Sequence, residues 1–302
     1  MTRMLPLFLL LFAGNLVAQE GTAEGFSLSS SNSLQFSQVA LSNWSSGGES
    51  SLALNGAFTA VAQHRQGRIS TDVAANWMIG VFKSADVPVR KTNDQLTIVG
   101  ISGFHFSPNF GVGVLADLST QVAPSYIFER STVLALGGDP VKGIKTGDFL
   151  SPGSIELGLG FRLVKAKPLL DLILAPLMMK QTVILDKDTR ALDETLGLYG
   201  NEGKTVRSEA GAYLKLFVSA PLMENVTADG KLKLFANYAD QDVDSSLVLN
   251  ISGKINQLLS ASIHTTLLHD NDVDTDAGKP GKQNRVQIRE IVGLNLTYAF
   301  HL

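Results

Sequence analysis

Apolar and polar residues alternate along most of the chain. Between residues 68 and 82, odd positions such as Ile69 and Trp77 are apolar, whereas even positions include Asp72 and Asn76. Successive side chains of a β-strand point to opposite faces, so a period of two predicts strands with one apolar and one polar face. A helix would need apolar residues at i, i+3 and i+4, which these segments lack. The pattern therefore predicts an all-β protein.

Twelve segments carry this alternation. They cover residues 33–43, 50–63, 68–82, 95–107, 110–122, 153–164, 168–184, 205–219, 226–239, 243–254, 257–269 and 285–300. Short connections at 65–67, 107–109, 165–167, 221–224 and 255–256 alternate with connections at 44–49, 84–94, 123–152, 185–204, 240–242 and 270–284, most of which are longer. Transmembrane barrels have short periplasmic turns and longer extracellular loops. We therefore predict a single closed antiparallel transmembrane β-barrel of about 12 strands, in preference to a secreted β-sandwich.

The first residues resemble an export signal. A basic start at Arg3 precedes the apolar run Leu5–Phe12, and small residues end at Ala18. This order predicts a signal peptide at 1–18 and a barrel domain at 19–302. A short membrane anchor is the alternative, but the apolar run is too short to span a bilayer comfortably. Beyond residue 18, even the most apolar stretch contains Asp171 and Pro176, so no transmembrane helix is expected.

The last residues of the chain also indicate a barrel. Tyr298, Phe300 and Leu302 share one face of the final strand. Outer-membrane barrels typically end in a strand with an aromatic residue at or near its C-terminus, which the barrel assembly machinery reads. We therefore expect insertion into the outer membrane of a Gram-negative bacterium, with membrane lipid and that machinery as partners.

Composition removes several classes of function. The chain has no Cys, which excludes disulfides, thiolate metal sites and a lipoprotein anchor. Its net charge is −3 and its positive charge is not concentrated in any segment, so no nucleic-acid partner is expected.

Several stretches of the sequence resemble a known but uncharacterised family. They are Leu34–Glu49, Thr120–Pro124, Asp148–Pro152, Leu157–Gly160 and Arg285–Gly293. In this order they resemble a family of Gram-negative outer-membrane proteins catalogued as a domain of unknown function. The resemblance implies a barrel in the outer membrane, and it implies no activity and no catalytic or ligand residues.

The alternation also predicts which charged side chains face the lumen. They are Asp72, Asp117, Glu156, Arg162, Asp171, Arg207, Glu209, Lys215, Asp229, Lys231, Lys233, Asp244, Lys254, Arg285 and Arg289. Both signs are present, so the lumen is either a narrow water-filled pore with a mixed-charge lining or a closed interior filled by salt bridges. Eight strands leave little interior space and sixteen leave an aqueous channel, and twelve lie between these limits. The apolar run 132–136 in the long 123–152 loop either folds inward as a constriction or packs on the rim.

Two acidic features require separate interpretation. Asp270, Asp272, Asp274 and Asp276 have a spacing of two, which suits the hard oxygen ligands of calcium, although the loop departs from the EF-hand pattern. The alternatives are a calcium loop and a solvated acidic loop, and no other cofactor is expected. Glu290 falls on the lipid face, which implies either a place at the membrane interface or a β-bulge that turns it inward.

The sequence shows no convincing catalytic site. Ser262 and His264 share a face, but a nucleophile needs a base and a third orienting group, and no residue stands out for that third role. A lipid hydrolase with its site at the rim is therefore a remote alternative. Two functions remain open, namely a pore for small solutes, and a structural or partner-binding membrane protein with a closed lumen and an unidentified protein partner.

Overall fold

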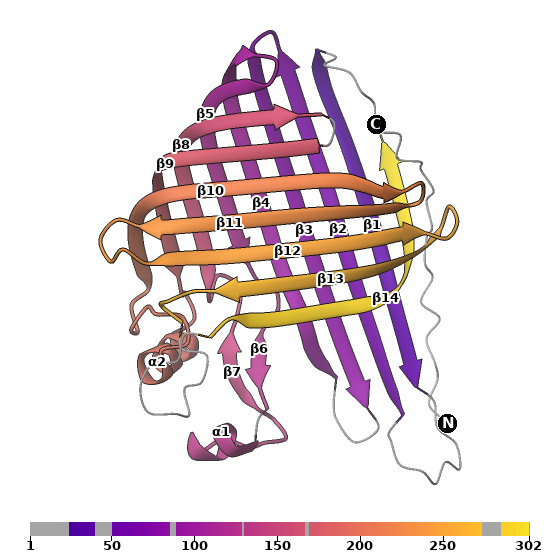
Figure 1. The fold of residues 1–302 in the computed structure, drawn as a ribbon. Coiled ribbons are helices and arrows are strands. Elements are labelled where there is room, and N and C mark those ends of the chain that lie inside the picture. The colour runs from indigo at the N-terminus through magenta and orange to yellow at the C-terminus, as the bar shows by residue number, and fades with distance from the viewer. Residues whose placement is uncertain are drawn as a thin grey trace.

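The computed structural model describes residues 24–39, 50–84, 89–128, 130–166, 169–273 and 285–301. Twelve strands form one closed antiparallel barrel, in which β14 closes on β1 (Figure 1). The barrel strands are β1 (Gly25–Val39), β2 (Ser51–Gln66), β3 (Ile69–Ser84), β4 (Arg90–Ser107), β5 (Phe110–Thr120), β8 (Gly153–Lys165), β9 (Leu169–Val183), β10 (Val206–Met223), β11 (Val226–Asn237), β12 (Val243–Lys254), β13 (Leu259–His269) and β14 (Gln287–His301). This architecture confirms the predicted fold class. The proposed signal at 1–18 lies outside the described residues.

The short turns gather at one end of the barrel. Gly25 at the start of β1 pairs with Arg65 beside the β2–β3 turn, and His301 at the end of β14 pairs with Ser29. The barrel therefore begins and ends at the short-turn end. The long connections lie at the opposite end, where β6 (Ser125–Ile127), β7 (Ile144–Gly147) and the helices α1 (Arg130–Ala135) and α2 (Lys187–Leu196) lie beyond the barrel strands (Figure 1).

The alternation did not predict these four small elements. One of them, α1, shows where the apolar run 132–136 lies. That run lies largely in α1, outside the barrel interior. Val133 is fully buried beside Gly138, where an added Cβ would lie 3.0 Å from Val133 and 2.8 Å from Ile144. Val133 thus packs within its own loop unit, and the suggestion that the run constricts the lumen is wrong.

The α2 helix owes its position to its two caps. The Asp186 carboxylate accepts a hydrogen bond from the Thr189 N–H at 2.9 Å, which is a standard N-cap contact. Gly197 ends the helix in the left-handed conformation with φ 63°, which glycine adopts without strain.

The outer surface of the barrel is apolar. Leu177, Val292 and Leu294 are 65%, 64% and 59% exposed, and each lies on the outward face of its strand. Near the short-turn end, Phe106 and Phe110 belong to a chain of ring contacts with centroids about 6 Å apart. Such a surface is stable against hydrocarbon, and transmembrane barrels carry aromatic girdles at both interfaces. No helix in the described part of the chain is long and apolar enough to cross a membrane.

Glu290 lies on this outer face and is exposed. The register of β13 and β14 runs without a shift from Leu259↔Leu296 to Leu268↔Gln287, so no bulge between these strands turns Glu290 inward. Since β14 begins at Gln287, the carboxylate lies close to the long-loop end. This position agrees with the interfacial alternative.

Candidate functional site in the barrel interior

The interior holds a central ionic cluster. Lys233 on β11 lies 3.1 Å from Asp117 on β5 and 3.3 Å from Glu156 on β8. Three strands, β8, β9 and β10, separate β5 from β11, so Lys233 and Asp117 can meet only across the concave side of the wall. Lys215 on β10 approaches the same Asp117 at 4.0 Å. The side chain of Asp117 is 1% exposed, which places the cluster inside the barrel.

A second cluster lies toward the short-turn end. Arg162 on β8 contacts Asp72 on β3 at 2.5 Å and Asp171 on β9 at 2.7 Å. Its guanidinium passes over β5 and β4, where Gly111 and Gly113 line a small cavity with it. A Cβ on Gly113 would lie 2.4 Å from a carbonyl oxygen of the next strand, so only glycine fits at this position. Arg65 adds a second cation to Asp72 at 2.6 Å.

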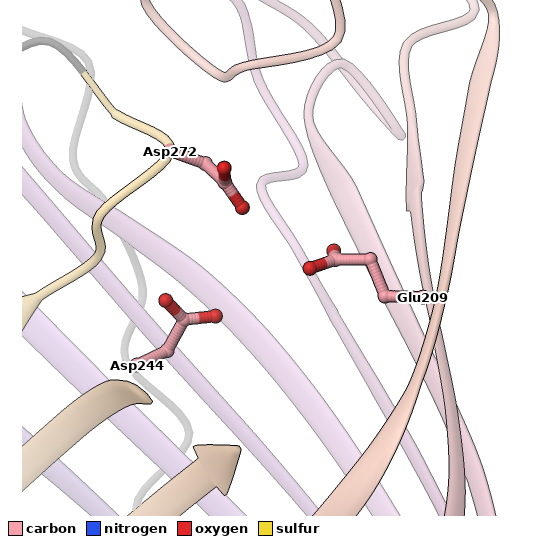
Figure 2. A group of neighbouring side chains, drawn as sticks. All are labelled: Glu209, Asp244 and Asp272. Atoms are coloured by element: carbon pink, nitrogen blue, oxygen red, sulfur yellow. The ribbon is translucent and has the colours of Figure 1, made fainter. Parts of the chain in front are cut away.

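A third cluster lies toward the long-loop end. Lys180 contacts Asp244 at 2.5 Å and Glu209 at 3.6 Å, while Arg207 pairs with Glu209 and Asp272. Figure 2 shows the carboxylates of Glu209, Asp244 and Asp272 turned toward one another. One oxygen of each lies within 4.8 Å of the other two. Two cations already neutralise most of this negative charge. The predicted calcium ligands are only partly visible here, because Asp274 and Asp276 lie outside the described residues. Asp270 accepts a hydrogen bond from the Asp272 N–H at 2.8 Å, and calcium binding stays a prediction.

Apolar side chains fill the space between these clusters. A buried group from five strands packs together, namely Val99, Leu115, Ile173, Ala175, Met178, Tyr213 and Phe235. The ammonium groups of Lys233 and Lys180 lie 5.6 Å and 5.2 Å from the rings of Tyr213 and Phe235. The interior side of β4, β5 and β8–β11, called here the occupied half, is therefore filled by paired charges and packed apolar groups.

Part of the remaining interior wall carries neutral amides and hydroxyls. The register aligns Asn295, Gln35, Asn55, Gly80 and Asn93 as successive partners on β14, β1, β2, β3 and β4. We call this row the amide belt. Asn55 donates to the Gln35 side chain at 3.1 Å, and Asn295 donates to the Ser262 hydroxyl at 2.8 Å. Ser29, Ser31 and Ser33 follow Gln35 on the same face of β1 toward the short-turn end, and all three are half-exposed.

The structure also places five other predicted lumen residues, of which Lys254 ends β12. Asp229 accepts hydrogen bonds from Ser219 at 2.6 Å and Asn250 at 3.3 Å. Arg289 donates to Asn93 at 2.7 Å, across the β1–β3 wall. Lys231 faces inward between Asp229 and Lys233 on β11. Arg285 lies two residues before β14, at the rim, and is exposed.

Sequence reasoning missed Lys180 and Arg65. Simple alternation along β9 places Asp171 inward and even positions outward. A bulge after Ala175 breaks the alternation, because Ala175 pairs with Tyr213 whereas Met178 pairs with Gly211. Pro176 in the middle of the segment was the available signal, since proline within sheets is confined to edges and bulges. Arg65 was assigned to the turn, but β2 extends to Gln66.

The residues of the remote hydrolase hypothesis make separate contacts. The Ser262 hydroxyl accepts from Asn295, whereas His264 Nε2 lies 3.3 Å from the Thr266 hydroxyl. The two residues therefore do not form a nucleophile–base pair in this structure.

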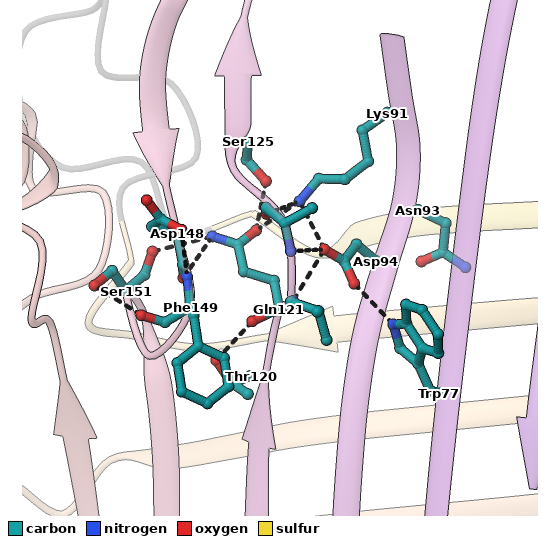
Figure 3. A network of polar contacts seen from close by, with 12 residues as sticks. Trp77, Lys91, Asn93, Asp94, Thr120, Gln121, Ser125, Asp148, Phe149 and Ser151 are labelled. Atoms are coloured by element: carbon teal, nitrogen blue, oxygen red, sulfur yellow. Dashed lines mark hydrogen bonds and ion pairs between the residues drawn. The ribbon is translucent and has the colours of Figure 1, made fainter.

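Polar contacts also fasten the long connection 121–152 to the rim (Figure 3). Asp94 accepts from Trp77 Nε1 at 3.1 Å, from Lys91 at 3.0 Å and from the Ala123 N–H at 2.7 Å. The Gln121 amide donates to the carbonyl oxygens of residues 148 and 151. This connection is thereby held to β4, and Trp77 of β3 supports Asp94 there.

A latch beyond the barrel joins β7 to the start of α2. Lys145 contacts Asp148 at 2.5 Å and Asp186 at 2.9 Å, and these two carboxylates raise the pKa of Lys145. Burial acts to raise the pKa of Asp186, but hydrogen bonds from Thr189 and Lys145 outweigh it and lower that pKa to about 2. The latch is therefore fully charged at neutral pH.

Comparison with known proteins matches one family to part of the chain. A family described as a protein of unknown function, DUF3078, matches residues 36–126. The matched family is DUF3078. The match confirms the resemblance of the sequence to an uncharacterised family. No curated protein sequence matches the chain.

Three solved structures illustrate the structural likenesses. The translocator domain of the autotransporter NalP from Neisseria meningitidis has 8% identity and a TM-score of 0.38, and the alignment covers 92% of this chain and 90% of that chain. An outer membrane channel from Pseudomonas putida F1 has 11% identity, a TM-score of 0.41 and coverage of 95% and 99%. The NanC porin has 7% identity, a TM-score of 0.41 and coverage of 89% and 98%.

The DUF3078 segment contains β2 to β5 and most of the rim contacts around Asp94. It also supplies Asp72 and Asp117 to the ionic clusters, and Asn55 and Asn93 to the amide belt. Their ionic partners Arg162 and Lys233 lie outside the DUF3078 segment, so both clusters join it to the rest of the barrel.

Proposed function

We propose that the protein is an integral outer-membrane barrel that passes small solutes through a narrow lumen. The apolar outer surface and the aromatic contacts near the short-turn end support placement in a membrane. The signal peptide and the final strand predicted from the sequence support export to the outer membrane, with short turns in the periplasm. No catalytic role is proposed.

The main support for a pore is that the two halves of the barrel interior differ in their lining. Paired charges and apolar groups fill the occupied half, whereas the amide belt and the serines of β1 line the other side. Neutral hydrogen-bonding groups bind water readily and impose no strong charge barrier. A passage for small solutes would therefore run along β13, β14, β1 and β2.

One contact favours the alternative of a closed lumen. The Arg289–Asn93 hydrogen bond joins β14 to β4 and passes over three strands of the neutral wall. A barrel kept closed by this contact would be a structural or partner-binding membrane protein. The loop unit of β6, β7, α1 and α2 would then be the surface available to a partner.

Conductance of the purified, folded protein in a planar bilayer separates these functions. Stepwise openings are expected, and Ser33→Trp should reduce their unit conductance because Ser33 lies on the interior face beside Gln35. Asn32→Trp is the matched control, since Asn32 pairs with Phe58 on the outer face and should leave conductance unchanged. A silent bilayer with demonstrably folded protein would reject the pore and favour the structural alternative.

A further inference from the structure

Arg289 differs from the other interior arginines in its partners. Arg65, Arg162 and Arg207 each contact a carboxylate. Arg289 instead donates to the amide oxygen of Asn93 at 2.7 Å and to the Thr266 hydroxyl at 3.4 Å. Within the described part of the chain, no carboxylate forms an ion pair with it, and its Nε is buried without an acceptor.

The register places a second cation, Lys231, in the same row as Arg289. Lys231, Val248, Thr266 and Arg289 are successive partners on β11, β12, β13 and β14. No ion pair joins Lys231 to a carboxylate of the described residues. Three strand spacings separate Lys231 from Arg289, or about 14 Å. Two cations without a paired carboxylate thus lie on the same stretch of wall.

The neighbours of Arg289 do not cancel its charge. Asp229 lies one row nearer the short-turn end, and Ser219 and Asn250 already donate to it. His264 and Asn250 are register partners in that row, and neither carries a negative charge. Arg289 therefore faces neutral acceptors in a partly buried place. A guanidinium in such surroundings lacks the counter-ion that compensates best for its desolvation.

We propose that Arg289 and Thr266 form a binding site for small solutes that carry a carboxylate or phosphate group, with Lys231 attracting them along the wall. The inference rests on the proposed passage, because a solute reaches Arg289 through the lumen. An oxyanion would replace the neutral Asn93 oxygen with a charge-assisted hydrogen bond, which is roughly twice as strong. Binding would also release the Arg289–Asn93 contact that crosses the neutral wall.

The direct test measures anion binding to the folded full-length protein in detergent micelles. Inorganic phosphate and acetate are titrated calorimetrically at constant ionic strength, with sodium chloride as the balancing salt. Saturable binding of at least one of them is expected. Arg289→Gln should weaken it by about tenfold to a hundredfold, as expected for the loss of a charged hydrogen-bond donor. Arg289→Lys should give an intermediate affinity, because it keeps the charge and loses the planar fork.

Lys254→Gln is the matched control. Lys254 lies on the interior face of β12 at the short-turn end, and its replacement removes one positive charge away from the site. Affinity for the anions should stay at the level of the unmodified protein. Absence of saturable binding by the unmodified protein, or equal binding by Arg289→Gln, would overturn the proposed site.

Bilayer recordings of the same proteins distinguish a failure of the anion site from a failure of the proposed pore. Arg289-dependent anion binding without any current would reject the pore and leave the site supported. Stepwise currents without anion binding would support the pore and reject the site.

Discussion

Lys231 and Lys233 lie two residues apart on the interior face of β11, yet their surroundings differ. The sequence pattern treats them alike, because alternation reports only which face a residue occupies. The structure places Lys233 between Asp117 and Glu156, whereas no carboxylate of the described residues pairs with Lys231. That difference depends on strands β5 and β8, which are distant in sequence, and no local pattern contains it.

Charge reversal at these two positions should therefore have different effects. Lys233→Glu leaves Asp117 and Glu156 without their main cation and adds a third carboxylate. Breaking a buried pair costs about 3–5 kcal/mol, so this variant should lose most of its folded barrel. Lys231→Glu breaks no observed ion pair and should fold normally. Urea unfolding of both variants in micelles measures the difference in stability. Equal stability of the two variants would contradict a stabilising role for the central cluster.

The outward face of the same strand provides a second test at the residue scale. Leu232 pairs with Leu216 on β10 and Leu247 on β12, on the face opposite Lys231. An arginine on the lipid face near mid-depth costs about 2–4 kcal/mol, so Leu232→Arg should strongly reduce the folded fraction in membranes. Lys231→Arg is the control and should fold as the unmodified protein does. The unheated mobility of each variant on gels gives the folded fraction, and a fully folded Leu232→Arg would show that the faces are assigned wrongly.

At the scale of the elements, the period of two predicted all twelve barrel strands because each has one face toward lipid. It could not predict β6, β7, α1 and α2, which lie beyond the barrel strands and do not experience that environment. It also failed along β9, where the bulge at Pro176 inverts the alternation and moves Lys180 inward. Strand existence thus follows from local pattern, whereas ionic partners follow from closure of the barrel.

The latch between β7 and α2 should depend on pH. The pKa of Asp186 is lowered to about 2, so its contribution is complete above the ordinary aspartate pKa of about 4 and is lost as pH falls toward 2. The pKa of Lys145 is raised, so its contribution is complete below the ordinary lysine pKa of about 10.4 and is lost only at higher pH. Stability of this unit should therefore fall between pH 4 and pH 2, with no change near neutrality.

Hydrogen exchange of the amides in 144–147 and 187–196, corrected for intrinsic rates, measures this effect. Protection should decrease as pH falls from 4 to 2. Asp186→Asn should show the lower protection already at pH 7, because it removes the charge that pairs with Lys145. Protection that stays constant down to pH 2 would exclude a stabilising role for the latch.

At the scale of the whole molecule, the barrel has an asymmetric interior. Ionic clusters and an apolar core join β4, β5 and β8–β11, and they brace one side of the wall. The amide belt and the serines of β1 line the other side, where the serines and Asn55 are half-exposed and Gln35 and Asn93 are buried. In the proposed function, the salt bridges and the passage, which the sequence left open as alternatives, would occupy different halves of the interior.

Single-cysteine labelling along β1 tests this division most directly, because the chain contains no native Cys. Cysteines at Ser31 and Ser33 in folded protein should react with a small water-soluble maleimide, whereas cysteines at Asn32 and Leu34 should not. A cysteine at Leu115, which is 2% exposed in the occupied half, should also stay unreactive. Uniform reactivity at residues 31–34, or no reactivity at Ser31 and Ser33, would contradict a water-lined passage beside β1.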